Sequence, residues 1–138
     1  MLAFACQSAP AVARAGALEV RDAYAFEPVL GDVASTYFSI RNTGTAPDSL
    51  SGVTSEQARS VMMHRQVDDD GQAIMRHLET VEIAAGATVT FAPGGTHLML
   101  EQLTALVTAG DTLDLMLHFN RAGDVVVRAP VRPYGSSE

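Results

Sequence analysis

Apolar and polar residues alternate along several short stretches of this chain. In residues 113–119 every odd-numbered position is apolar, which is the two-residue period of a strand with one buried face. No segment keeps a sustained helical period, and only residues 55–60 and 102–107 could hold a helical turn. The pattern therefore predicts strands almost throughout. Shorter runs rich in β-branched residues lie at 81–83, 88–91 and 125–127.

Turn-forming residues separate the expected strands. Strands punctuated by turns about every 8 to 12 residues are typical of a β-sandwich or barrel. We therefore expect one all-β domain over residues 18–133, with loose ends at 1–17 and 134–138. The turn signals include Asn42-Thr43-Gly44, Asp68-Asp69-Asp70-Gly71, Pro93-Gly94-Gly95 and Ala109-Gly110-Asp111.

Charge and hydropathy narrow the range of partners. Sixteen acidic residues against nine basic ones give a net charge of −7, which argues against nucleic acid or an anionic membrane surface as the main partner. No apolar stretch approaches the roughly 20 residues of a membrane-spanning helix, so we expect no membrane span. We also expect the folded domain to be a monomer.

The first 17 residues have the composition of the end of a secretory signal. They are rich in alanine and contain small-x-small triplets at 11–13 and 13–15, although the charged and apolar regions that normally precede such triplets are short. We expect a periplasmic or other extracytoplasmic protein; the alternative is a cytosolic protein with an unstructured tail.

The chain has a single cysteine, Cys6, within this leader. One cysteine excludes an internal disulfide framework and a zinc site of the multi-cysteine kind. A lipid anchor on Cys6 stays open, but Phe4 is large at a position where lipoprotein cleavage sites use small residues.

Histidine and methionine are concentrated in one stretch of 38 residues. Strand alternation in residues 97–100 separates the two leucines from His97 and Met99. With the leucines turned inward, an imidazole and a thioether lie side by side on the outer face. The whole stretch contains Met62, Met63, His64, Met75, His77, His97 and Met99.

A second pairing of the same kind follows from the turn predicted at residues 68–71. A four-residue loop there sets His64 opposite Met75. A register shifted by two residues sets His64 opposite His77 and keeps Met75 as a diagonal neighbour on the same face. Both registers have an even loop, and a shift by one residue would break the relation.

Two imidazole nitrogens and two thioether sulfurs form a soft ligand set. Thioethers select Cu(I), and imidazole is an acceptable companion, whereas protein zinc sites do not use methionine. A blue-copper centre needs a thiolate, and no cysteine lies near these residues. We therefore expect a Cu(I) site formed by His64, Met75, His97 and Met99.

Several neighbouring residues are expected outside the ligand set. Met62 shares the face of His64 and is expected at the rim of the site, while His77 is expected to support the ligands or to be solvated. Met63 points the other way, toward the core. Met116 and His118 face outward on another strand, where an accessory metal site is possible but has no support from the sequence.

The four expected ligands reproduce the pattern H-x10-M-x21-H-x-M, which resembles the periplasmic copper chaperones called PCu(A)C. The similarity extends over roughly residues 18–132. It includes the segments 37–44, 84–86, 91–100 and 110–119.

This resemblance implies a cupredoxin-like Greek-key β-sandwich that binds one Cu(I) at a surface-exposed site. It also implies export, no enzymatic activity, and delivery of copper to the CuA centre of cytochrome c oxidase, directly or with a Sco-type thioredoxin-fold partner. Some members carry a His/Met-rich C-terminal extension with a Cu(II) site, which we do not expect here. The alternatives are a β-sandwich interaction module with an incidental cluster, a general copper-tolerance protein and a copper-dependent oxidoreductase.

Overall fold

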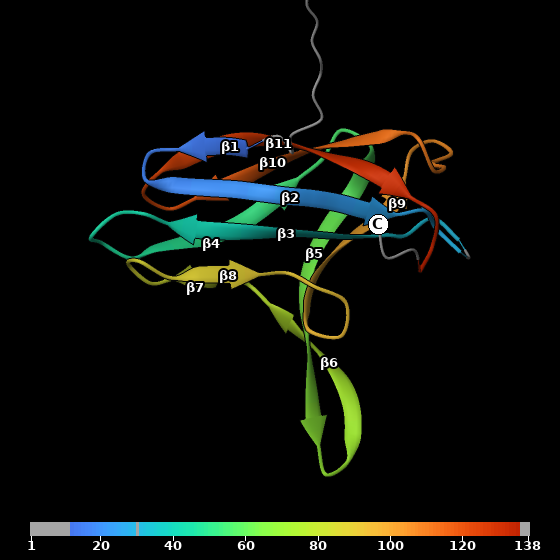
Figure 1. The fold of residues 1–138 in the computed structure, drawn as a ribbon. Helices are drawn as coiled ribbons and strands as arrows, with labels where there is room; N and C mark the ends of the chain where they lie inside the picture. The colour runs from blue at the N-terminus through green and yellow to red at the C-terminus, as the bar shows by residue number, and fades with distance from the viewer. Residues whose placement is uncertain (1–11, 30, 136–138) are drawn as a thin grey trace, which may run out of the picture.

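The computed structural model describes residues 12–29 and 31–135, and in this part of the chain every regular element is a strand. The all-β prediction is confirmed, and no helix that could serve as a membrane span lies within the same residues. The strands are β1 (Val12–Ala15), β2 (Leu18–Phe26), β3 (Ala34–Asn42), β4 (Asp48–Thr54), β5 (Ala58–Asp69), β6 (Gln72–Leu78), β7 (Val81–Ile83), β8 (Thr88–Thr90), β9 (Thr96–Leu103), β10 (Thr112–Phe119) and β11 (Gly123–Arg132), shown in Figure 1.

The strands form two layers that are joined through β11. The order along the sheet is β6-β5-β9-β3-β2-β11-β10-β4-β7, with β1 paired to β2 and β8 paired to β3. The first part of β11 pairs antiparallel with β10, and its last two residues, Val131 and Arg132, pair parallel with β2. One strand thus passes from one layer to the other and closes one side of the sandwich (Figure 1).

The core lies between the layers, and strand alternation selects its residues. On β10 the inward residues Leu113, Leu115 and Leu117 are at most 1% exposed, as their odd-position pattern predicts. The opposite layer contributes Phe38, whose ring stacks on Phe91 with centroids 4.6 Å apart. These buried side chains supply the apolar area that stabilises the fold.

Neither of the two segments that could hold a helical turn forms one in the described structure. Residues 55–57 form a turn that leads into β5, and residues 102–107 begin as the end of β9. Gln57 explains the difference, because its backbone carbonyl accepts from Thr104 N (2.9 Å) and its side chain accepts from Asp114 N (3.1 Å). Bonds to residues that are distant in the sequence therefore replace the local bonds that a helical turn would need.

Both ends of the described chain are more ordered than we expected. Residues 12–15 fall within the segment assigned to the leader, yet they form β1 and pair with residues 18–21 of β2. At the other end, the Tyr134 ring packs edge-on against Phe26 with centroids 5.7 Å apart. Cys6 and the rest of the leader lie outside the described residues.

The hairpin of β5 and β6 projects from the sandwich, as the lower part of Figure 1 shows. Its loop has two residues, Asp70 and Gly71, with φ angles of 53° and 83°, as a type I′ turn requires. Asp68 and Asp69 are therefore strand residues, and the four-residue loop was wrong. The register shifted by two is the observed one.

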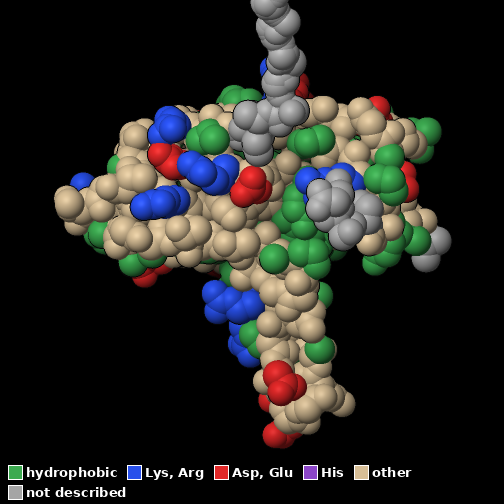
Figure 2. Space-filling view, viewed as in Figure 1, with side chains coloured by type: hydrophobic (Ala, Val, Ile, Leu, Met, Phe, Trp, Pro, Cys, Tyr) green, Lys and Arg blue, Asp and Glu red, His purple; other side chains and the backbone are tan. Residues whose placement is uncertain are grey.

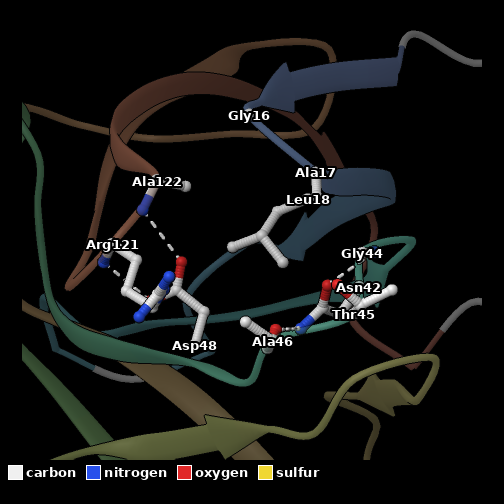
Figure 3. A pocket seen from close by; sticks show the side chains of 10 residues that line it. All are labelled: Gly16, Ala17, Leu18, Asn42, Gly44, Thr45, Ala46, Asp48, Arg121 and Ala122. Carbon is white, nitrogen blue, oxygen red and sulfur yellow. Dashed lines mark hydrogen bonds between the residues drawn. The ribbon is translucent and has the colours of Figure 1, made fainter.

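The turn that begins at Asn42 borders a pocket, which Asn42, Gly44 and Asp48 line (Figure 3). The Asn42 side chain donates to the carbonyls of Ala46 (2.9 Å) and Ile83 (3.1 Å). Nearby, the Asp48 carboxylate accepts from the backbone N–H groups of Arg121 and Ala122. Burial tends to raise the pKa of Asp48, but these bonds hold it below its ordinary value. These contacts tie the β3–β4 turn to the loop before β11.

Candidate metal centre

Three adjacent strands bring the histidines and methionines to one face of the sheet. On β5 and β6, His64 lies directly opposite His77, and on the other side of β5 it lies opposite His97 of β9. The ring centroids are 5.7 Å apart for His64 and His77 and 5.9 Å apart for His64 and His97. Residues 97 and 64 are thus neighbours, although 32 residues separate them in the sequence.

His97 is less accessible than its outward-facing position predicts. It is only 6% exposed, because its strand is central and aromatic side chains line the same cavity beside it. Its Nδ1 lies 3.2 Å from the carbonyl oxygen of Gly95. A carbonyl can only accept, so this contact places the proton of a neutral ring on Nδ1 and leaves the Nε2 lone pair for a metal.

Met99 follows His97 by two residues and shares its face. It lies opposite Met62 of β5 on one side and opposite Ser35 of β3 on the other. The Ser35 hydroxyl donates to the Met99 sulfur at 3.5 Å. This weak bond fixes the position of the thioether without using both of its lone pairs.

Met75 reaches the site from the projecting hairpin. It lies opposite Gln66 and is 57% exposed, so it is the most open of the four expected ligands. Met75, His97 and Met99 together line a cavity of about 500 Å³. His64 does not line this cavity but adjoins it through the His97 ring.

Burial and charge act together on His64. Its partial burial lowers its pKa below the ordinary value of 6.5, and repulsion from charge on His97 and His77 lowers it further, against a smaller opposite effect of Glu101. The neutral imidazole, which is the form that binds a metal, is therefore favoured at this position.

An aromatic wall borders the cavity. Phe26, Tyr37 and Tyr134 line it, and the Phe26 and Tyr37 rings lie 5.7 Å apart in an edge-on arrangement. Burial raises the pKa of Tyr37, which keeps its hydroxyl neutral. Sequence analysis missed this wall and Ser35, because alternation in 34–42 shows which residues face outward but not that β3 adjoins β9.

The remaining residues of the stretch lie as expected. Met63 is 5% exposed and belongs to the core, while Met62 and His77 share the face of the expected ligands. Among the described residues, no three His, Cys, Asp or Glu side chains are grouped so that they could hold a metal ion. The candidate centre is thus a mixed set of two imidazoles and two thioethers, the soft combination that suits Cu(I).

Comparisons with known proteins bear on the fold and the family. A family model described as "Putative lipoprotein LpqE-like" matches residues 18–131. The putative lipoprotein Lxx21020 of Leifsonia xyli subsp. xyli is 30% identical over 106 residues. The match covers 76% of this chain and 64% of that protein, so the chain spans less than two thirds of this curated relative.

Solved structures of PCuAC domains share the fold. The copper-bound PCuAC domain from PmoF2 is 26% identical with a TM-score of 0.77, over 89% of this chain and 98% of that one. Apo-DR1885 from Deinococcus radiodurans is 25% identical with a TM-score of 0.66, over 100% and 92% of the two chains. The expected resemblance to PCuAC domains is confirmed, and with the matched family model we conclude that the chain belongs to the family of LpqE-like putative lipoproteins.

Proposed function

We propose that this chain is a copper chaperone that carries Cu(I) between His64, Met75, His97 and Met99. The observation that carries the proposal is the pairing of β6, β5 and β9, which brings two histidines and two methionines from three strands to one face. Thioether sulfur with neutral imidazole selects Cu(I) over harder cations. The similarity to a copper-bound PCuAC domain supports the same metal.

The arrangement suits a carrier more than a catalyst. Neutral ligands bring no charge that would favour Cu(II), so the ion has little tendency to change oxidation state. Met75 is open to solvent on the projecting hairpin, where an incoming ligand of an acceptor could replace it. The family resemblance points to the CuA centre of cytochrome c oxidase, or a Sco-type partner, as the acceptor. Transfer of copper to a purified soluble CuA domain would test this choice.

Export belongs to the same proposal. The family description and the Leifsonia relative both carry the word lipoprotein. We propose an extracytoplasmic location and regard Cys6 as the candidate lipid attachment site. Cell fractionation would test the location, and recovery of the full chain in the cytoplasm would contradict it.

The decisive experiment is a titration of the apo-protein with Cu(I) against a chromophoric chelator, without oxygen. Replacing His97 and Met99 by alanine removes two of the four ligands. The double variant should bind at this site more than about 100-fold more weakly, since even residues outside the ligand set contribute about 10- to 100-fold. Unchanged affinity in a folded double variant would overturn the assignment.

A matched control separates the loss of ligands from the loss of a methionine as such. Met63→Leu replaces a methionine of the neighbouring strand β5 that faces the core, with little change in volume. This variant should bind copper as the wild type does. If neither the wild type nor the control binds copper, the result would favour the alternative hypothesis, a β-sandwich interaction module in which the histidine and methionine cluster is incidental.

A further inference from the structure

The outer face of the second layer carries another methionine–histidine pair. Met116 and His118 of β10 alternate with the buried leucines and are both partly exposed. They have the same two-residue spacing as His97 and Met99, in the reverse order. The function proposed above uses neither residue.

The His118 ring is held at both nitrogens. Its Nδ1 lies 2.9 Å from the carboxylate of Asp124, the residue directly opposite it on β11. Its Nε2 lies 3.1 Å from the hydroxyl of Thr54 on β4. A carboxylate can only accept, so in the neutral ring Nδ1 carries the proton and the Nε2 lone pair points to the Thr54 hydroxyl. A carboxylate on the far nitrogen is the usual support of a metal-binding histidine.

The Met116 side chain shares the sheet face and the cavity to which this lone pair points. Thr54 is the cross-strand partner of Met116, so the hydroxyl that occupies Nε2 belongs to a residue directly beside the thioether. Met116, His118 and Thr54 all line one cavity of about 360 Å³. An ion placed at the Thr54 hydroxyl would face both an imidazole nitrogen and a sulfur.

The charges around this cavity favour a cation. Its lining includes the carboxylates of Glu56, Asp114 and Asp124 and one guanidinium, that of Arg128. Arg128 lies 3.6 Å from Asp114, which leaves two carboxylates without a positive neighbour in the lining. The local field therefore attracts positive ions and repels anionic ligands.

The geometry points to a second Cu(I) site in this cavity, formed by the Nε2 of His118 and the Sδ of Met116. Binding displaces the Thr54 hydroxyl from Nε2, and Asp124 acts as a positioning residue that holds the ring through Nδ1. The thioether selects a soft monovalent ion over Mg²⁺ or Ca²⁺, and two neutral ligands suffice for low-coordinate Cu(I). This site is weaker than the first, because it has fewer ligands and is partly exposed.

The test is Cu(I) titration of the full chain in the His97→Ala, Met99→Ala background, where the first site is disabled. One equivalent of Cu(I) should still bind, more weakly than Cu(I) binds to the first site of the wild type. This binding should disappear when Met116→Leu and His118→Gln are added. These replacements preserve side-chain bulk, and unfolding in urea verifies that each variant folds. Loss of all copper in the first double variant, with folding intact, would overturn the second site.

Two further measurements separate a metal site from a structural network. Asp124→Asn should weaken the second equivalent about tenfold and change the tautomer of His118, seen in its ring ¹⁵N shifts. Thr54→Val removes the competing hydroxyl and should leave the affinity equal or higher. Binding that persists without Met116, or equal affinity for Zn(II), would overturn the assignment to soft copper. The second site would also be overturned if the chain still bound two equivalents of Cu(I) after only residues 116 and 118 had been changed.

Discussion

Strand β10 and the hairpin of β5 and β6 follow the same alternation but differ in what covers them. One face of β10 packs into the sandwich along its length, and its leucines are at most 1% exposed. The pairing of β5 with β9 ends at Arg65 and Thr96, and beyond that point β5 pairs only with β6. Figure 2 shows this part of the hairpin standing clear of the body, with basic side chains at its root and acidic ones at its tip.

This difference divides the proposed copper ligands into two groups. His97 and Met99 lie on β9, between β5 and β3, where several strands support them. Met75 lies on an exposed two-stranded hairpin, and such hairpins are only marginally stable in water. The sandwich therefore fixes these two ligands together with His64, which is still paired with His97, and the hairpin supplies Met75, which is free to open locally.

The largest loss of stability should come from a substitution in the sandwich itself, outside the projecting hairpin. Leu115→Ala removes a side chain that is 1% exposed and should lower the free energy of unfolding by about 3 kcal/mol, through lost burial and the cavity left behind. Ile74→Ala in the hairpin should cost about 1 kcal/mol or less, because Ile74 is only half-buried. Urea unfolding measures both. Equal losses would show that the hairpin is as well supported as the body.

Two glycines test whether the hairpin opens separately. Gly71 and Gly123 both have positive φ angles, 83° and 90°, and an added Cβ would meet no atom within 4 Å at either. Each replacement by alanine should therefore cost about 1 kcal/mol of backbone strain. Gly71→Ala should speed hydrogen exchange in residues 66–76 and leave β10 unchanged, whereas Gly123→Ala should speed exchange in β10. Equal acceleration of hydrogen exchange in β10 by both variants would show that the hairpin does not open separately from the sandwich.

The smallest effect concerns pH at the root of the hairpin. The pKa of His64 is lower in the folded chain than its ordinary value of 6.5, so the folded state binds fewer protons than the unfolded state. The contribution to stability is present above pH 6.5 and is lost as the pH falls toward the lowered pKa. His64→Gln should make the unfolding free energy less dependent on pH between 7.5 and 5. An unchanged slope would show that His64 does not titrate differently on folding.

Local patterns in the sequence predict much of the fold and the content of the site. Alternation identifies the buried face of β10 and sets His97 beside Met99, because both depend only on neighbours along one strand. The Asp70-Gly71 pair is a strong signal for a two-residue turn and would have selected the correct register, but the longer acidic run made a four-residue loop equally reasonable.

Contacts between distant strands could not be predicted in the same way. The Ser35 hydroxyl meets the Met99 sulfur across 64 residues, and nothing local indicates that β3 and β9 pair. Strand β1 was missed for another reason, since an alanine-rich segment of four residues has little strand propensity and depends on β2 for its order. Packing of Tyr134 on Phe26 likewise depends on tertiary structure, because the two residues are far apart in the sequence.

The passage of β11 between the layers also bears on how the molecule avoids self-association. Closure on that side leaves open strand edges, in the described part of the chain, at β1, β6, β7 and β8. Three of these have four residues or fewer, too short to template a foreign strand well, and β6 carries the charged Arg76. Short or charged edges of this kind oppose edge-to-edge pairing between copies of the chain.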